Sequence, residues 1–266
     1  MMEQITSVKN NRVKNWASLK QKKFREQSGL YLAEGLRLVE EAVESGAPIE
    51  DILISGDVGS GKFDRIINAA TAMGTRMYEV NDMIIEHVAD TKTPQGVIAV
   101  VRKTEGDPFA FIANKERPLY LVLDGLQDPG NLGTMIRTAD AVGATGVFVG
   151  ANSVDLYNPK VVRATMGSLY HLPVFQHDLI DLMPKLKEEG VKVIGTAVEN
   201  GEPVFRADLS GAVALVIGSE ANGVSDVVAA LTDVNVTLPM PGQAESLNAA
   251  IASSVILYEA LRQRSF

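Results

Sequence analysis

The sequence contains no cysteine and only three histidines among its 266 residues. The lack of thiols excludes disulfides, thiolate metal ligands and cysteine nucleophiles, and it is compatible with a reducing cytoplasm. His87, His171 and His177 are too few to favour a zinc site. We therefore expect no metal in this protein and no covalent cross-links.

Long apolar runs are missing as well. The longest, at 119–123 and 213–217, have the length of strands and are too short to span a bilayer. The N-terminal residues lack the apolar core of a signal peptide, so we expect a cytoplasmic protein that does not associate with membranes. The content of 46% hydrophobic and 22% charged residues is typical of a globular chain, with room for one large domain or two of ordinary size.

The charge of the chain is unevenly distributed. The net charge is −8, yet residues 1–30 hold seven basic and two acidic residues and so carry +5, which leaves −13 on the other 236. A basic segment on an acidic body is typical of a protein that contacts a polyanion with one end. The run alone favours the alternative of a solvated helix face. The candidate RNA-binding residues are Lys9, Arg12, Lys14, Lys20, Lys22, Lys23 and Arg25.

The order of the predicted elements indicates two α/β domains. Helices and strands alternate in the first hundred residues, beginning with a basic helix over 10–25 and a strand over 30–33. Residues 103–117 are polar and contain Gly106 and Pro108, which is typical of a linker. We predict a first domain at 1–104, a linker at 105–117 and a second domain at 118–266.

The second half of the chain predicts a parallel sheet. It starts with an apolar run at 119–124 that is typical of a strand buried on both faces. Strands and helices then alternate with short connections, as in open α/β sheets. Further strands are predicted at 146–149, 191–196, 213–217 and 233–238, and helices at 131–142, 159–166, 178–189, 224–231 and 246–264.

Residues 56–62, with the sequence GDVGSGK, are similar to a phosphate-binding loop that follows a predicted strand. The backbone N–H groups and the lysine of such a loop bind phosphates. The next residue is Phe63 instead of Ser or Thr, so the hydroxyl that would hold magnesium is absent. We therefore favour a surface turn over a nucleoside triphosphatase.

Three segments at predicted strand ends carry side chains suited to catalysis. The first, DGLQDPGNLGTMIR (124–137), contains a turn and then a helix that bears Asn131 and Arg137. We expect Asn131 to cap this helix and Gly133 to permit a close approach of backbone or ligand. Taken singly, each feature also fits a purely structural role.

The second and third segments also follow predicted strands. GSEANG (218–223) places Glu220 between two glycines directly after an apolar run. LPMPGQAESLN (238–248) leads to the final helix, which Ser246 and Asn248 open. Ser246 has no His or Lys nearby in the sequence to activate it as a nucleophile, so we expect it to be a helix cap.

Taken together and in this order, the three segments resemble the SpoU (TrmH) family of RNA ribose 2′-O-methyltransferases, which belongs to the SPOUT class. The family motifs Asn-x-Gly-x-x-x-Arg and Gly-x-Glu-x-x-Gly match residues 131–137 and 218–223, and its Pro-Met pair followed by Ser-Leu-Asn matches 239–248. Residues 31–42 and 93–101 are similar to the family's N-terminal substrate-binding domain, which is like ribosomal protein L30e. The resemblance covers nearly the whole chain.

This resemblance implies an α/β fold whose C-terminal SPOUT domain forms a deep trefoil knot, an exception to the rule that chains do not thread their own loops. It implies S-adenosylmethionine (SAM) as cofactor, held in the knot largely by backbone groups. It also implies a homodimer, in which Arg137 acts on SAM bound to the partner subunit. The implied cofactor-binding residues are Thr196, Ala197, Gly218, Leu238, Met240 and Leu247.

The resemblance also implies the catalytic residues Arg137, Asn131, Glu220, Ser246 and Asn248. Because a guanidinium stays protonated, we expect Arg137 to grip the phosphate beside the ribose and to stabilise the developing alkoxide instead of acting as a base. Asn131, Ser246 and Asn248 are expected to orient Arg137 and the ribose. Glu220 is expected to pair with Arg137 or to hold a loop.

The substrate that the separate N-terminal domain favours is 23S ribosomal RNA, with transfer RNA as the alternative. A non-catalytic RNA-binding or ribosome-assembly protein that keeps the knot is a second alternative, and a small-molecule methyltransferase is a third. Binding of SAM and incorporation of methyl groups into ribosomal RNA distinguish these classes.

Overall fold

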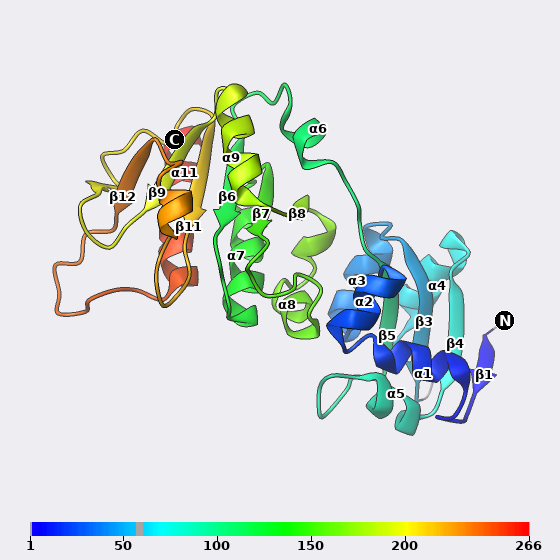
Figure 1. Ribbon diagram of the computed structural model, residues 1–266. Helices are drawn as coiled ribbons and strands as arrows, with labels where there is room; N and C mark the ends of the chain where they lie inside the picture. Colours follow the sequence, from blue (N-terminus) through cyan, green and yellow to red (C-terminus); the bar gives the residue numbers. More distant parts are fainter. Residues whose placement is uncertain (1, 57–60, 266) are drawn as a thin grey trace. The chain divides into compact units, whose positions relative to one another are not determined.

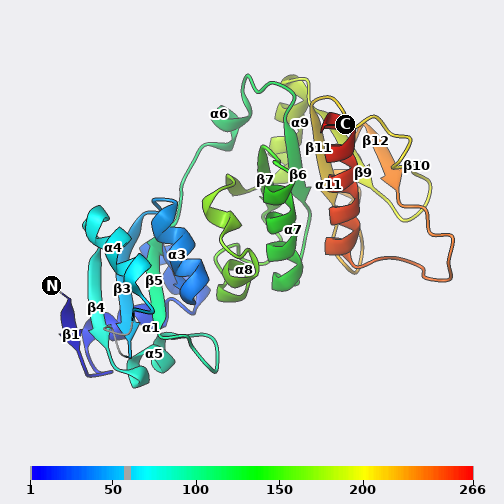
Figure 2. The same ribbon diagram turned by 180° about the vertical axis from the view of Figure 1, so that it is seen from behind.

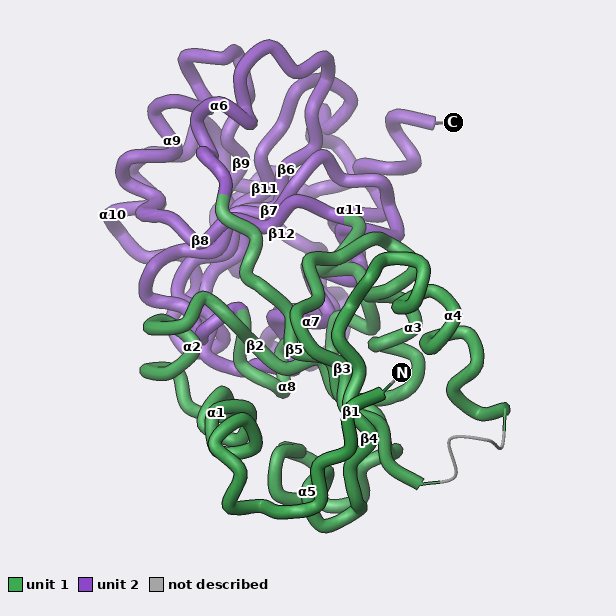
Figure 3. The backbone as a smooth tube through the Cα atoms, turned by 90° about the vertical axis from the view of Figure 1, so that its right-hand side faces the viewer, with its two compact units in different colours: residues 1–105, 157–171 green, residues 106–156, 172–266 purple. Residues whose placement is uncertain are grey.

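The computed structural model describes residues 2–56 and 61–265, which form two compact units. Unit 1 comprises residues 1–105 and 157–171, and unit 2 comprises residues 106–156 and 172–266 (Figure 3). Each unit contains one sheet with helices packed against it and has its own buried apolar clusters. The predicted α/β class is therefore confirmed.

Unit 1 is built on a mixed five-stranded sheet of order β1-β4-β3-β5-β2, in which β5 runs antiparallel to its neighbours β2 and β3 (Figure 1). Its strands are β1 (Glu3–Ile5), β2 (Leu30–Glu34), β3 (Ile49–Ser55), β4 (Arg76–Val80) and β5 (Val97–Arg102). Its helices are α1 (Asn11–Ser18), α2 (Lys22–Ser28), α3 (Leu36–Glu44), α4 (Asp64–Met73), α5 (Asp82–Val88) and α8 (Pro159–Ala164), with a 3₁₀ turn η2 (Ser168–Tyr170).

The core of unit 1 lies on both faces of this sheet. Because side chains alternate along a strand, β3 points Ile52 and Ile54 to one face and Leu53 to the other, and all three are fully buried. Apolar residues of α3 and α4 cover the first face, and residues of α1 and α5 cover the second. The sheet is thus the middle layer of three.

The basic segment at the N-terminus forms two helices instead of the single predicted one, with a break at residues 19–21. Val13 and Trp16 of α1 are buried in the core, so this segment is an integral part of unit 1. Arg25 is only 2% exposed and donates hydrogen bonds of 2.8 Å to the carbonyls of Leu19 and Lys20. These bonds fasten α2 to the break, which gives Arg25 a structural role instead of the expected contact with RNA.

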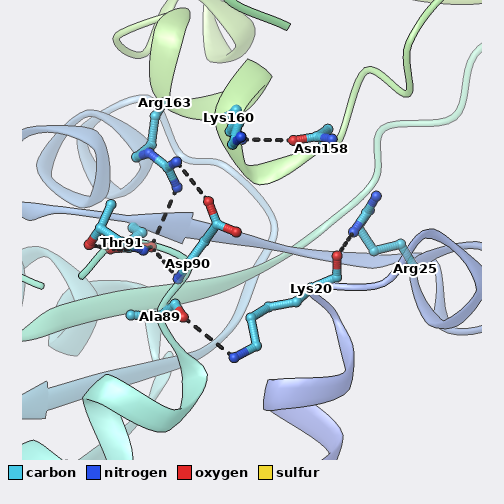
Figure 4. Close-up of polar contacts among 9 residues, drawn as sticks. Lys20, Arg25, Ala89, Asp90, Thr91, Asn158, Lys160 and Arg163 are labelled. Carbon is cyan, nitrogen blue, oxygen red and sulfur yellow. Dashed lines mark hydrogen bonds and ion pairs between the residues drawn. The ribbon is translucent and has the colours of Figure 1, made fainter.

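Residues 157–171 pack with unit 1, although the sequence predicts one contiguous domain over 118–266. Figure 4 shows Arg163 of α8, whose guanidinium lies 2.8 Å from the carboxylate of Asp90. The same guanidinium lies 3.5 Å from Glu34, a 7% exposed residue that also accepts the backbone N–H of Asp90. A pattern of apolar residues does not reveal such ion pairs between distant segments, which is why the sequence did not predict this docking.

Unit 2 is built on a seven-stranded sheet of order β10-β12-β9-β11-β6-β7-β8 in which every neighbouring pair is parallel. This confirms the predicted parallel sheet. Its strands are β6 (Leu119–Leu123), β7 (Gly146–Gly150), β8 (Val174–His177), β9 (Lys192–Thr196), β10 (Glu202–Pro203), β11 (Val213–Ile217) and β12 (Val234–Thr237). Its helices are α6 (Pro108–Ile112), α7 (Pro129–Ala141), α9 (Leu179–Glu188), α10 (Asp226–Ala229) and α11 (Ala249–Ser265).

Helices lie on both faces of this second sheet. Figure 1 shows α9 in front of the strands, and Figure 2, from behind, shows α7 and α11 side by side on the opposite face. Leu182 and Leu186 of α9 pack with Val122 of β6 and Val216 of β11, and all four are fully buried. Because all strands of this sheet are parallel, their carboxyl ends lie at one common edge, where the loops that follow them begin.

Several elements were not predicted from the sequence, and one prediction falls partly outside the described residues. The predicted linker 105–117 contains α6, whose Ile112 is 2% exposed and belongs to the core of unit 2. The short strands β1, β8 and β10 had no apolar alternation strong enough to predict them. The loop 56–62, interpreted as a surface turn, falls partly on residues 57–60, which lie outside the described residues.

Candidate functional site at the carboxyl edge of the unit 2 sheet

Four adjacent strands bring the three candidate segments to one edge of the unit 2 sheet. The order β12-β9-β11-β6 is continuous, and the register aligns Ile217 with Leu123 and Val236 with Thr196. The first segment therefore starts beside the second, and the third starts one strand beyond β9. The chain leaves β6 towards β7 on one side and returns to β9 and β11 on the other. In parallel α/β sheets such a reversal of strand order is the usual place for a ligand.

Hydrogen bonds between side chains join all three segments. The amide Nδ2 of Asn131 donates to a carboxylate oxygen of Glu220 at 2.8 Å. The amide oxygen of Asn131 accepts a hydrogen bond of 3.1 Å from Nδ2 of Asn248. Asn131 uses its amide as both donor and acceptor, so residues 89 and 117 positions away in the sequence meet at one side chain.

The start of α7 supplies further donors to Glu220. The backbone N–H groups of Gln127 and Asp128 lie 3.4 Å from its two carboxylate oxygens. Asp128 is the N-cap of α7 and accepts the backbone N–H of Asn131 at 2.8 Å, so the expectation that Asn131 caps this helix is wrong. Because Asp128 is the cap, the side chain of Asn131 is available to Glu220 and Asn248.

The carboxylate of Glu220 is held in its charged form. Burial alone would raise the pKa of Glu220, but the hydrogen bonds from Asn131, Gln127 and Asp128 outweigh it and leave the pKa below its usual value. A carboxyl whose pKa is lowered by folding stabilises the folded state above its ordinary pKa, and this contribution disappears as the pH falls through the lowered value. At neutral pH the site therefore contains an anion fixed at the helix N-terminus, where the helix dipole favours negative charge.

Asn248, and not Ser246, caps the final helix. Its side-chain oxygen accepts the backbone N–H of Ala250 at 2.9 Å and of Ile251 at 3.2 Å. Ser246 is exposed and lies before the cap. The amide of Asn248 thus begins α11 with its oxygen and reaches α7 with its nitrogen.

Arg137 lies on α7 and is exposed. Within the described part of the chain it makes no hydrogen bond or ion pair, and it is not paired with Glu220. It follows Asn131 by six residues, more than a turn and a half, so the two side chains leave the helix on different faces. Of the two roles expected for Glu220, the structure agrees with holding a loop, since the carboxylate fastens residues 127–128.

The expected cofactor-binding residues follow the ends of three neighbouring strands. Thr196 ends β9 and donates its hydroxyl to the carbonyl of Val216 at 2.9 Å, and the N–H of Ala197 reaches the carbonyl of Val236 at 2.9 Å. Gly218 follows β11. Leu238 and Met240 follow β12, and Leu247, which precedes α11, is 41% exposed. The first four therefore lie at one level of the sheet edge.

Gly218 is required by a close approach of two backbone segments. A Cβ atom at this position would lie 1.9 Å from the carbonyl carbon of Gly223, a distance that no side chain can occupy. Ser219 and Gly223 exchange two backbone hydrogen bonds of 2.9 Å, which close the turn that presents Glu220. The glycines of the second segment thus fix the position of its carboxylate.

Asp124 is a further site residue, to which the sequence analysis gave no role. It directly follows β6, is 9% exposed, and its Oδ2 accepts the backbone N–H of Ser225 at 2.7 Å. This bond joins the loop after β6 to the loop after β11, and the Asn131–Glu220 bond joins the same two segments. An aspartate directly after a buried strand is the signal that could have found it, because a carboxylate there must be hydrogen-bonded.

Among the described residues, no three His, Cys, Asp or Glu side chains are grouped as metal ligands, and no helix has the length and apolarity needed to cross a bilayer.

We expect Gly218→Ala to destabilise unit 2, because the turn 218–223 would have to open to admit a methyl group. The free energy of unfolding should fall by about 1–3 kcal/mol, measured by thermal or denaturant unfolding. Gly211→Ala is the matched control, since a Cβ at Gly211 meets no atom within 4 Å and should change stability by less than about 0.5 kcal/mol. Equal effects of the two substitutions would contradict this account of Gly218.

Comparisons with known proteins match both parts of the chain. The family model described as SpoU rRNA Methylase family matches residues 118–258, and the MRM3-like substrate binding domain matches residues 10–99. The chain is 39% identical over 257 residues to 23S rRNA (guanosine(2553)-2′-O)-methyltransferase RlmP of Bacillus subtilis, covering 97% of this chain and 98% of that protein. It is 35% identical to the 23S rRNA (uridine(2479)-2′-O)-methyltransferase of Streptomyces viridochromogenes, covering 98% and 92%.

Solved structures give the same result. The AdoMet-bound rRNA methyltransferase of Sinorhizobium meliloti superposes with a TM-score of 0.88 at 32% identity, over 98% of each chain. The resemblance derived from the three motifs is thereby confirmed, and this chain belongs to the SpoU rRNA methylase family.

Proposed function

We propose that this protein transfers a methyl group from SAM to the 2′-hydroxyl of a ribose in 23S ribosomal RNA. The observation that carries the proposal is the hydrogen-bonded link from Glu220 through Asn131 to Asn248, which assembles one residue of each family motif at one sheet edge. The names of the relatives support ribose 2′-O-methylation of 23S rRNA, and the AdoMet-bound neighbour supports SAM as cofactor.

The residues at the sheet edge fit an adenosyl group. The ends of β9, β11 and β12 offer backbone groups and small residues such as Ala197 and Gly218, and Leu247 adds an exposed apolar surface. A flat apolar heterocycle with a polar edge is held well by such a combination. We assign Thr196, Ala197, Gly218, Leu238, Met240 and Leu247 to this site. When bound, SAM supplies an electrophilic methyl group on its sulfonium.

Arg137 is assigned to the RNA side of the reaction. Its guanidinium is exposed and has no partner among the described residues, so it is available to a phosphate oxygen of the substrate. A guanidinium that bonds the phosphate also places positive charge near the 2′-oxygen, where negative charge develops as the proton leaves. Since it stays protonated, it positions and stabilises, and the proton passes to another group or to water.

Arg137 and the ribose are oriented by Asn131, Asn248 and Ser246. Glu220 holds the start of α7 in place. The chain Glu220–Asn131–Asn248 connects the beginning of α7, the helix that bears Arg137, to the beginning of α11. Such fixed geometry is how positioning lowers the barrier of a two-substrate reaction. Ser246 is exposed in the loop before α11, and we assign it to the ribose.

We expect Arg137→Ala to lower kcat for methyl transfer by roughly 100-fold or more, because a charge aimed at the transition state is lost. SAM affinity, measured by calorimetry, should be unchanged. Arg206→Ala removes another exposed arginine of unit 2 and serves as the control, with wild-type turnover expected. Near-normal kcat for Arg137→Ala would reject the role assigned to Arg137.

We also propose that unit 2 contains a trefoil knot and that the protein forms a homodimer. The exposed face of α11 supports the homodimer. Helix α11 buries Leu257 and Ala260 against unit 2 but leaves Ile251 and Tyr258 more than half exposed, with Val255 36% exposed between them. These three residues recur at helical spacing and form one apolar stripe, which we assign to a second copy of the chain. In such a dimer, Arg137 of one subunit meets SAM in the other.

We expect Ile251→Glu to convert the dimer to a monomer in analytical ultracentrifugation, because a carboxylate would be buried in the apolar contact. Ile180→Glu is the control, since Ile180 is 50% exposed and belongs to α9, which covers the opposite face of the sheet from α11. A wild-type protein that sediments as a monomer at every concentration would contradict the proposed dimer.

The exposed basic side chains of unit 1 are assigned to the RNA phosphates. Lys9, Lys14 and Lys23 are exposed, whereas Lys20 and Lys22 are engaged with the carbonyl of His87 and with Glu26. Arg12, also exposed, is bonded to Glu3. Phosphate contacts of this kind give affinity that falls as salt rises.

We expect Lys14→Ala combined with Lys23→Ala to weaken RNA binding and to reduce the slope of log affinity against log salt by about 1–2. Substitutions suit this test better than removal of residues 1–25, which would also remove the buried Trp16. Lys185→Ala with Lys192→Ala in unit 2 is the matched control and should leave the slope unchanged. Identical slopes for the wild type and both double variants would contradict the proposed RNA contact and would favour a helix face exposed to solvent.

A further inference from the structure

Unit 1 contains a pocket of about 400 Å³ that the proposed reaction does not use. It opens beside the basic N-terminal helices and is bounded by α1, α2 and the strands β2 to β5. The lining residues that matter here are Arg12, Trp16, Phe24, Gln27, Asp51 and Tyr78. Its volume is in the range of pockets that take small organic ligands.

Aromatic and guanidinium groups form one part of the lining. The rings of Trp16 and Tyr78 lie 5.1 Å apart at their centroids, and the guanidinium of Arg12 lies 5.0 Å above the ring of Tyr78. Trp16 and Tyr78 are almost fully buried, whereas Phe24 is 37% exposed and the side chain of Arg12 is 47% exposed. Phe24 and Arg12 therefore present flat surfaces, on which a planar ring can stack, at the mouth of a pocket with an aromatic floor.

A second part of the lining is polar and has acceptor capacity left. Asp51 is 8% exposed, and its Oδ2 accepts the indole N–H of Trp16 at 2.9 Å. Its buried Oδ1 lies 2.9 Å from Nε of Arg76 as an ion pair, yet it receives no well-aligned hydrogen bond from the described residues. This oxygen has acceptor capacity left, and a ligand N–H reaches it when the exposed side chain of Arg76 swings away. The exposed amide of Gln27 supplies both a donor and an acceptor.

The charge of the pocket argues against a free anion. Arg12 and Arg76 are balanced by Glu50 and Asp51 within the lining, so the pocket itself has no net charge. The surrounding segment 1–30, by contrast, carries +5. The ligand that fits both facts is a neutral planar heterocycle with hydrogen-bonding edges, attached to a polyanionic chain.

We propose that this pocket binds one unstacked nucleobase of the RNA substrate. This proposal rests on the proposed function, in which unit 1 binds RNA. Proteins recognise unpaired RNA bases by stacking them on aromatic rings or guanidinium planes and by hydrogen-bonding their edges. Phe24 and Arg12 provide the stacking surfaces, Asp51 and Gln27 bond the edge of the base, and the nearby lysines hold the flanking phosphates. The pocket thereby selects RNA with a base turned out of its helix.

Trp16 is the only tryptophan of the chain and lies in the pocket, so its fluorescence reports on occupancy. The experiment titrates the full-length protein with a single-stranded RNA oligonucleotide and with a fully paired duplex of the same sequence. It follows Trp16 emission and, separately, the bound fraction by filter binding. We expect the emission to change with the single strand in proportion to binding, and the duplex to bind without this change.

Phe24→Ala tests the stacking surface and should weaken binding of the single strand by roughly 5- to 100-fold. Phe109→Ala is the matched control, because Phe109 is also 37% exposed but belongs to unit 2. Gln27→Ala removes an exposed side chain that does not support the fold, and it should weaken the single strand in the same direction. SAM affinity should be the same in all three variants, since SAM is assigned to unit 2.

The outcomes separate this proposal from the proposed function. If the wild-type protein methylates 23S rRNA but Trp16 emission stays constant at saturating RNA, the pocket is not a base site and the proposal fails alone. Wild-type affinity of both Phe24→Ala and Gln27→Ala for the single strand would overturn it equally. An absence of SAM binding and methyl transfer by the wild type would instead overturn the proposed function. A Phe24→Ala protein that does not fold leaves Gln27→Ala and the emission change to decide.

Discussion

The candidate active site depends on one hydrogen-bonded carboxylate. Glu220 lies in a turn after β11, and its charge is held by the amide of Asn131 and by two backbone N–H groups at the start of α7. Asn131 also accepts a hydrogen bond from the side chain of Asn248. The side chain of Asn131 therefore connects the start of α7 to the start of α11 at the sheet edge. Hydrogen bonds to a charged carboxylate are stronger than bonds between neutral groups. Such bonds suit a site that is assembled from loops.

Backbone geometry does the rest of the positioning in unit 2. Gly218 lets the turn 218–223 close on itself, and Asp124 ties the loops after β6 and β11 together. The side chains assigned to SAM are mostly small or apolar, so the proposed cofactor site has no cluster of charges to mark it. Unit 1 is organised differently, with exposed lysines around a pocket lined by aromatic rings, Arg12 and Asp51. We assign chemistry to unit 2 and recognition of RNA to unit 1.

The sequence predicted the main strands and helices because their apolar residues recur with clear periods. It predicted the family because three spaced motifs occur in one order, and the comparisons confirm this. The sequence did not predict hydrogen bonds and ion pairs between side chains of distant segments. The sequence favours Asn131 as a helix cap, although Asp128 fills that role, and it places Arg25 among the exposed basic residues, although Arg25 is buried. Periodicity also could not show that residues 157–171 pack on unit 1, since the ion pairs of Arg163 decide that.

The most direct test of the central interaction is a double-mutant cycle between Asn131→Ala and Glu220→Ala, with the free energy of unfolding as the measured quantity. If the two side chains depend on each other as described, the effects are non-additive, with a coupling energy of about 0.5–3 kcal/mol. Additive effects, with a coupling energy near zero, would contradict the account, because Glu220 would then hold its turn without Asn131.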